Sequence, residues 1–183
     1  RAGAAAISVL TEPSWFKGTL DDLRSVRSRL DSAGRPAVLR KEFIIDPYQV
    51  VEARVAGADA LLLIVACLSD AELREFLKLT TELGMEALVE VNGSEEMARA
   101  LDVGATVIGV NNRNLHTFEV DLGTTERLAK GLPSDVLLAA LSGISTREDV
   151  QRFQDAGAAA VLVGEALMRA DDPAAKIAEL RGV

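Results

Sequence analysis

The sequence is poor in the residues that often carry chemistry: it has one cysteine, one histidine and one tryptophan in 183 residues. A lone Cys67 excludes a disulfide within the chain and favours a reducing, cytoplasmic location. Because Cys67 sits in the apolar run 61–68, we expect it to be buried. A lone His116 argues against a Ser-His-Asp triad and a histidine metal site. No membrane-spanning run or signal peptide is visible.

Positive charge is also scarce, since 28 acidic residues outnumber 20 basic ones and the net charge is −8. This balance argues against nucleic acid or an anionic membrane as partner. It leaves room for a small anionic ligand, because a few backbone amides and one lysine can hold a phosphate. Aromatic residues make up only 4% of the chain and hydrophobic residues 49%, which is typical of one domain with layered α/β packing.

Short apolar runs alternate with amphipathic stretches along the whole chain. The predicted strands are 5–10, 37–43, 60–65, 87–92, 107–111, 136–141 and 159–164. The predicted helices are 20–32, 48–56, 70–83, 94–102, 124–130, 147–156 and 173–180. Strict alternation favours a parallel sheet with helical crossovers.

A Gly-Ala pair recurs before every second predicted strand, about every fifty residues, as in a closed array of paired units. Seven strands are visible and a (β/α)₈ barrel needs eight. We therefore expect residues 1–183 to be a single TIM-barrel domain holding strands two to eight, with the first strand-helix unit missing from this sequence. The chain begins with Arg1, not Met, which also suggests an earlier start. An open sheet is the alternative, but no dinucleotide fingerprint follows any strand.

Polar residues at the carboxyl ends of barrel strands carry functional information. Lys41 ends one apolar strand, Glu90 lies inside another, and Asn111 and Arg113 share a face at the end of a third. A lysine and a glutamate in an apolar funnel can act as general acid and base. A structural ion pair is the equally weighted alternative for Lys41 and Glu90.

Small residues follow the last two strands, where such barrels commonly hold a phosphate. Ser142 and Gly143 end one strand, and Gly164 and Glu165 end the next. We expect phosphate binding there; the alternative is that the glycines only turn the chain. Trp15 and Phe16 follow the first visible strand and form either a wall for a flat substrate or an apolar plug.

At these residues the sequence resembles the indole-3-glycerol-phosphate synthase family of tryptophan biosynthesis. The matching stretches cover nearly the whole chain in order: Ser8–Glu12, Val38–Tyr48, Ala87–Asn92, Ile108–Leu115, Ser142–Ile144 and Leu162–Met168. The resemblance implies a (β/α)₈ barrel that acts as a carbon–carbon lyase without cofactor or metal. Such an enzyme converts 1-(o-carboxyphenylamino)-1-deoxyribulose 5-phosphate into indole-3-glycerol phosphate, carbon dioxide and water.

The same resemblance implies roles for individual residues. Lys41 would protonate the substrate carbonyl oxygen, Glu90 would transfer a proton in the dehydration, and Asn111 would orient the reacting groups. The implied substrate-binding residues are Phe16, Phe43, Arg113 and Leu115, of which the three apolar ones surround the aromatic ring. The implied phosphate-binding residues are Ser142, Gly143, Gly164 and Glu165.

Two departures from the family pattern keep other interpretations open. Leu141 stands where most members have glutamate, and the charged residues of the family's first strand are not in this sequence. Fungal members resemble this chain at Leu141 and are joined to glutamine amidotransferase and phosphoribosylanthranilate isomerase domains, which are therefore the expected partners. The alternatives are an inactive barrel domain of such a multifunctional protein, or another phosphosugar barrel such as phosphoribosylanthranilate isomerase.

Overall fold

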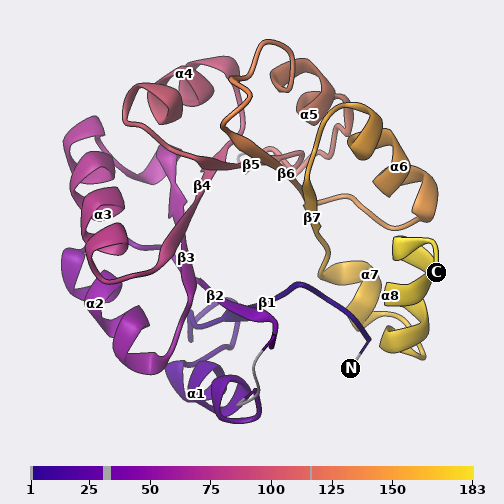
Figure 1. Ribbon diagram of the computed structural model, residues 1–183, viewed down its shortest axis with the longest axis horizontal. Helices are drawn as coiled ribbons and strands as arrows, with labels where there is room; N and C mark the ends of the chain where they lie inside the picture. Colours follow the sequence, from indigo (N-terminus) through magenta and orange to yellow (C-terminus); the bar gives the residue numbers. More distant parts are fainter. Residues whose placement is uncertain (1, 31–33, 116) are drawn as a thin grey trace. The chain divides into compact units, whose positions relative to one another are not determined.

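The computed structural model describes residues 2–30, 34–115 and 117–183, an α/β fold whose strands alternate with helices (Figure 1). Along the sheet the strands follow their order in the sequence. The strand pairs β1–β2, β2–β3, β5–β6 and β6–β7 are parallel. The strands are β1 Ala6–Leu10, β2 Ala37–Lys41, β3 Ala60–Ile64, β4 Glu86–Val91, β5 Val107–Asn111, β6 Leu137–Leu141 and β7 Ala160–Leu162. The helices are α1 Leu20–Ser28, α2 Pro47–Ala56, α3 Asp70–Glu82, α4 Ser94–Asp102, α5 Gly123–Leu128, α6 Arg147–Asp155, α7 Glu165–Met168 and α8 Pro173–Arg181.

The predicted alternation of strands and helices is confirmed, with element ends that differ by a few residues. The predicted helix 20–32 ends at Ser28, and residues 31–33 lie outside the described part of the chain. The short helix α7 and the 3₁₀ turn η1 (Val65–Cys67) are additional. The expectation for Cys67 was wrong, because η1 ends the buried run of β3 and leaves this side chain exposed. Among the described helices, none has the length and apolar character needed to cross a membrane.

The amino-terminal unit consists of Ala4–Val89 with Val103–Ala105. Its helices α1 and α3 pack against β1–β2 and β3, and α2 contacts both of these helices. The chain starts these helices with side-chain caps. Asp46 caps α2 through the Tyr48 amide and Pro47 follows as the first helical residue, where its missing N–H costs no hydrogen bond. The caps fix where each of these helices begins.

The carboxyl-terminal unit contains Glu90–Asp102 and Thr106–Val183 together with the first residues of the chain. Strands β5, β6 and β7 pair in sequence order, while α5 packs on β5 and α6 on β7. Ala140, Ile144 and Phe153 form a buried cluster between β6 and α6. Leu141, the departure from the family pattern, is buried at the end of β6 beside Leu162 of β7.

Candidate active site

Lys41 is the last residue of β2 and is partly buried. It stands opposite Leu10 of β1, and its carbonyl accepts a hydrogen bond of 3.1 Å from the Thr11 amide. Strand alternation places the neighbouring Arg40 on the other face of β2. The backbone at Lys41 is therefore held by pairing with β1 and by the contacts that the Arg40 side chain makes on the opposite face of β2.

Arg40 lies at the centre of a buried polar network and is 3% exposed. Its guanidinium donates to the Thr11 hydroxyl (3.1 Å), the Gln49 carbonyl (2.8 Å) and the Glu52 carboxylate (2.8 Å). The Thr11 hydroxyl donates in turn to the buried Glu42 carboxylate at 2.8 Å. Because Thr11 follows β1, Glu42 follows β2, and Gln49 and Glu52 belong to α2, the network ties the end of β2 to its neighbours. The sequence showed the charges but not their mutual pairing.

Two of the predicted aromatic-site residues come together in the amino-terminal unit. The rings of Phe16 and Phe43 stack with centroids 5.9 Å apart and planes inclined by 20°. They are 48% and 39% exposed, and the adjacent Trp15 is 85% exposed. The stack therefore presents an open apolar face of the kind that binds a flat ring, and Trp15 does not plug it. Leu115 lies in the carboxyl-terminal unit and is 40% exposed.

Glu12 folds the loop that carries Phe16. Its carboxylate accepts hydrogen bonds from the amides of Ser14 (2.7 Å), Trp15 (2.6 Å) and Phe16 (2.9 Å). The loop closes at Gly18, whose amide donates to the Glu12 carbonyl at 3.0 Å. A Cβ at Gly18 would collide with the carbonyl oxygen of the last residue of β1, so this position needs glycine. Sequence reasoning missed Glu12 as the residue that shapes this loop.

Acid is expected to release this loop. Desolvation raises the pKa of Glu12, but the hydrogen bonds from Phe16, Trp15 and Ser14 lower it by more, so that this pKa lies below the ordinary 4.5. The ionised Glu12 carboxylate therefore stabilises the loop fully above pH 4.5. This stabilisation is lost as the pH falls through the lowered pKa of Glu12 in the folded protein. Since Trp15 is the only tryptophan of this sequence, its fluorescence reports the loop. We expect its emission to titrate with a midpoint below 4.5, and Glu12→Gln to abolish that titration.

The matched control is Glu72→Gln at the start of α3. The pKa of Glu72 is also lowered, mainly by the hydrogen bond that it accepts from the Ser69 hydroxyl. This variant should keep the Trp15 titration. Far-ultraviolet circular dichroism at each pH separates loop release from general unfolding. A midpoint at or above 4.5, or a titration that survives in Glu12→Gln, would contradict the role of Glu12.

Glu90 and Asn111 meet in the carboxyl-terminal unit at the ends of β4 and β5. The Asn111 amide nitrogen donates to the Glu90 carboxylate at 3.0 Å, and the two residues are 6% and 4% exposed. The Asn111 amide oxygen accepts from the Arg113 backbone N–H at 3.0 Å, which fixes the orientation of the amide. Asn92, which the sequence did not single out, donates to the carbonyls of Asn111 (2.6 Å) and Arg113 (3.1 Å). The pair is a buried, oriented carboxylate–amide arrangement that can accept a proton.

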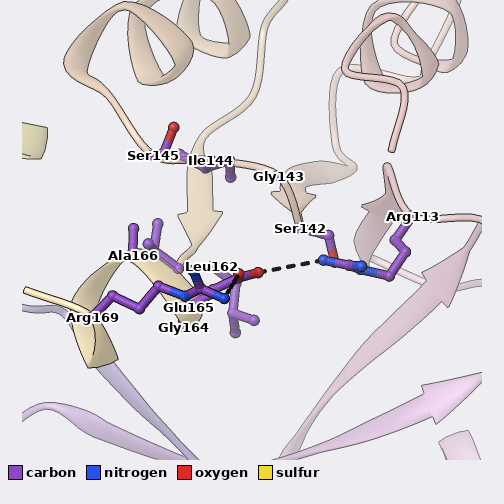
Figure 2. Close-up of a pocket in the computed structure, with 11 residues that line it drawn as sticks. Arg113, Ser142, Gly143, Ile144, Ser145, Leu162, Gly164, Glu165, Ala166 and Arg169 are labelled. Carbon is purple, nitrogen blue, oxygen red and sulfur yellow. Dashed lines mark ion pairs between the residues drawn. The ribbon is translucent and has the colours of Figure 1, made fainter. Parts of the chain in front are cut away.

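A cavity of about 300 Å³ lies at the ends of β6 and β7 (Figure 2). Arg113 and residues at and after the ends of these two strands line it, among them all four residues predicted to bind phosphate. The lining residues are Arg113, Ser142, Gly143, Ile144, Ser145, Leu162, Val163, Gly164, Glu165, Ala166 and Arg169. Ser142 (φ 66°) and Gly143 (φ 79°) are both in the left-handed region, which turns the chain sharply at the cavity edge. The structure thus brings together the two glycine-containing strand ends that the sequence singled out.

Glu165 lies between two guanidinium groups at this cavity (Figure 2). Its carboxylate is 3.5 Å from Arg113 Nη2 and 2.9 Å from Arg169 Nη2. Two cations around one carboxylate leave the cavity wall net positive, which suits an anion. The sequence analysis assigned phosphate binding to Glu165 but gave no role to Arg169, which directly follows the last residue of α7.

The predicted site residues fall into both units. Lys41, Phe16 and Phe43 belong to the amino-terminal unit, and the remaining ones belong to the carboxyl-terminal unit. His116 lies outside the described residues. Across residues 2–30, 34–115 and 117–183, no three His, Cys, Asp or Glu side chains group as metal ligands.

Solved structures share this fold at low sequence identity. A 3-hexulose-6-phosphate synthase from Salmonella typhimurium superimposes with a TM-score of 0.80 over 96% of this chain and 84% of that chain, at 16% identity. A further structure titled 3-hexulose-6-phosphate synthase gives a TM-score of 0.73 at 21% identity, over 96% of this chain and 86% of its own. Likeness at this level of identity shows the fold alone.

Sequence comparisons are more specific. The chain is 61% identical to a multifunctional tryptophan biosynthesis protein of Schizosaccharomyces pombe over 98% of its own length but spans only 24% of that protein. It is 54% identical to the indole-3-glycerol phosphate synthase of a Roseiflexus species, over 98% of this chain and 68% of the relative. The family model for indole-3-glycerol phosphate synthase matches residues 1–180. The chain belongs to the indole-3-glycerol phosphate synthase family.

Proposed function

We propose that this chain is the catalytic part of an indole-3-glycerol phosphate synthase. The enzyme would close the indole ring of 1-(o-carboxyphenylamino)-1-deoxyribulose 5-phosphate, releasing carbon dioxide and water, and would thus be a carbon–carbon lyase. The observation that carries this proposal is the match of the family model to residues 1–180, with Roseiflexus and Dehalococcoides relatives of that name at 54% and 52% identity. The buried Glu90–Asn111 pair and the cavity beside Arg113 support it.

The finer architecture is part of the same proposal. We infer that β1 to β7 correspond to strands two to eight of a (β/α)₈ barrel, in line with a chain that spans 68% of the Roseiflexus relative. The Schizosaccharomyces and Phycomyces relatives are named multifunctional tryptophan biosynthesis proteins, and this chain spans 24% of each. This supports covalently linked amidotransferase and isomerase domains as partners. A cytoplasmic location and the lack of a cofactor stay predictions from the sequence.

Each predicted residue has a task in this reaction. Lys41 donates a proton to the substrate carbonyl oxygen while the aromatic carbon attacks the carbonyl carbon. Glu90 takes up a proton during the dehydration, and Asn111 holds the Glu90 carboxylate in place at 3.0 Å. The substrate phosphate occupies the cavity edged by Ser142 and Gly143. Phe16 and Phe43 provide a stacked apolar face for the anthranilate ring.

The remaining predicted residues complete the substrate site in this proposal. Arg113 and Leu115 contact the substrate, Arg113 being placed at the cavity wall and Leu115 being partly exposed. Gly164 and Glu165 close the phosphate cavity from the β7 side. Because Glu165 is itself an anion, its pairing with Arg113 and Arg169 reduces the repulsion that it would exert on a phosphate group.

Glu90→Gln in the full-length protein tests both the activity and the role of Glu90. Glutamine keeps the oxygen that accepts from Asn111 but cannot take up a proton. We expect kcat for indole-3-glycerol phosphate formation to fall about 10²-fold, the low end for loss of general acid–base catalysis. KM should change by less than about threefold, because the geometry of the carboxylate–amide pair is kept.

Glu86→Gln is the matched control, since Glu86 is exposed at the other end of the same strand. It should leave kcat and KM unchanged. A wild-type protein that forms no indole-3-glycerol phosphate would overturn the proposed function. A normal kcat in Glu90→Gln would instead remove Glu90 from the mechanism and leave the function standing.

A further inference from the structure

Asn112, the neighbour of the predicted Asn111, uses both ends of its side-chain amide in the buried interior. It is 2% exposed. Its amide nitrogen donates to the carbonyls of Leu141 (3.0 Å) and Ser142 (3.3 Å). Its amide oxygen accepts from the backbone N–H (3.2 Å) and the hydroxyl (2.8 Å) of Thr125. One side chain therefore joins the end of β5, the end of β6 and the start of α5.

The backbone of Asn112 strengthens the same connection. Its N–H donates to the Leu141 carbonyl at 2.9 Å, and its carbonyl accepts from the Asp121 amide at 2.9 Å. The Leu141 carbonyl thus receives both the backbone and the side-chain donor of Asn112. Such a fully satisfied buried amide is rigid, because any rotation would leave donors and acceptors without partners.

The segment that Asn112 holds is strained. Ser142 is a non-glycine residue at φ 66°, and Gly143 follows at φ 79°. A Cβ at Gly143 would lie 2.5 Å from a Val120 methyl and 2.8 Å from a Leu122 methyl, so the turn also packs tightly. Left-handed non-glycine residues persist only where the surroundings fix them, and they cluster at ligand sites. The two hydrogen bonds from Asn112 to the carbonyls that precede Gly143 supply this restraint.

We propose that Asn112 is a positioning residue that holds the Ser142–Gly143 turn in the conformation that binds the substrate phosphate. This inference rests on the proposed function, which places the phosphate in the cavity edged by this turn. Asn112 acts only through the turn and through Thr125, since its own amide is fully used by them. Asparagine suits the position because the turn needs a donor and Thr125 needs an acceptor on one short side chain.

Asn112→Asp in the full-length protein keeps the shape, removes the donor and adds a negative charge, so the uncharged Thr125→Val variant separates lost positioning from charge repulsion. We expect KM for the substrate, and the inhibition constant of inorganic phosphate, to rise at least tenfold while kcat falls less than threefold. The reason is that the change acts on the phosphate cavity and not on the reacting atoms. A second variant, Thr125→Val, removes the hydroxyl that orients the amide and should raise both constants in the same direction, whereas Thr125→Ser should restore them.

A structural control separates positioning from stability. Thr80 is also fully buried and donates its hydroxyl to the Phe76 carbonyl at 2.6 Å within α3. Thr80→Val should lower the melting temperature without changing KM or phosphate inhibition. If Asn112→Asp does not fold, Thr125→Val and Thr125→Ser carry the test.

The outcomes distinguish this inference from the proposed function. A wild-type protein without turnover and without inhibition by phosphate would overturn the proposed function itself. An active wild type whose Thr125→Val and folded Asn112→Asp variants keep the wild-type KM and phosphate inhibition constant would overturn the positioning role. A lower melting temperature with unchanged KM would likewise show a purely structural role and overturn it.

Discussion

Lys41→Met in the full-length protein is expected to lower kcat for indole-3-glycerol phosphate formation by about 10³–10⁴-fold, the upper range for loss of a general acid. Methionine keeps an unbranched side chain, one atom shorter than that of lysine, but cannot donate a proton to the carbonyl oxygen. The fold should persist, because the end of β2 is held by the Thr11–Lys41 backbone hydrogen bond and by the contacts of Arg40. Steady-state kinetics measures the loss, and circular dichroism checks the fold.

Lys78→Met is the matched control for this substitution. Lys78 is a lysine with 77% of its side chain exposed and pairs only across the surface of α3 with Glu82 at 3.7 Å. Its removal should leave kcat unchanged. A Lys41→Met protein with kcat within threefold of the wild type would rule out Lys41 as the general acid, whatever the outcome for Glu90.

Arg40→Met is expected to produce the largest loss of local stability. Breaking a buried charge pair by removing one partner costs about 3–5 kcal/mol, because the other charge stays buried without compensation. Glu42, whose side chain is only 7% exposed, would lose the cation 3.7 Å away and keep the hydrogen bonds from the Thr11 hydroxyl and the Phe43 amide. By the relation of about 1.4 kcal/mol per tenfold change, backbone amides of β2 should exchange with deuterium roughly 10²–10⁴ times faster.

Hydrogen exchange followed by mass spectrometry measures this in the full-length protein, peptide by peptide. Arg24→Met is the control, because the Arg24–Asp21 pair of α1 is at the surface, with side chains 51% and 89% exposed. Surface pairs contribute little, so exchange in α1 should change by less than about threefold. Exchange of β2 amides in Arg40→Met at the wild-type rate would show that the network does not hold this strand end.

Most of the secondary structure could be predicted from the sequence because its signals are local. Apolar runs indicated the strands and amphipathic stretches indicated the helices, with ends that differ from the structure by a few residues. Errors occurred where a local pattern had two outcomes. The run that ends at Cys67 is equally apolar whether it continues as a strand or turns, and the 3₁₀ turn that exposes Cys67 left no mark in the composition.

The candidate site was predictable in part, for a related reason. Polar residues interrupting apolar strands pointed to Glu90 and Asn111, and the structure places their side chains 3.0 Å apart. The roles of Glu12 and Asn112 were missed, because each depends on which way a carboxylate or an amide points. Residue type alone does not mark either role, since glutamate and asparagine both occur elsewhere in the chain.

By itself the sequence determined the order of the elements, the family and the residue types at the strand ends, because each is written in contiguous stretches of chain. Tertiary structure alone decided which groups meet: the Thr11 and Glu42 side chains, the Asn112 amide and the Ser142 carbonyl, and the Arg113 and Glu165 side chains. These partners lie some 30 to 50 residues apart along the chain, too far for helix or strand periodicity to relate them. Their hydrogen bonds and ion pairs form only once packing has fixed the strand ends, because packing brings the two groups within bonding distance.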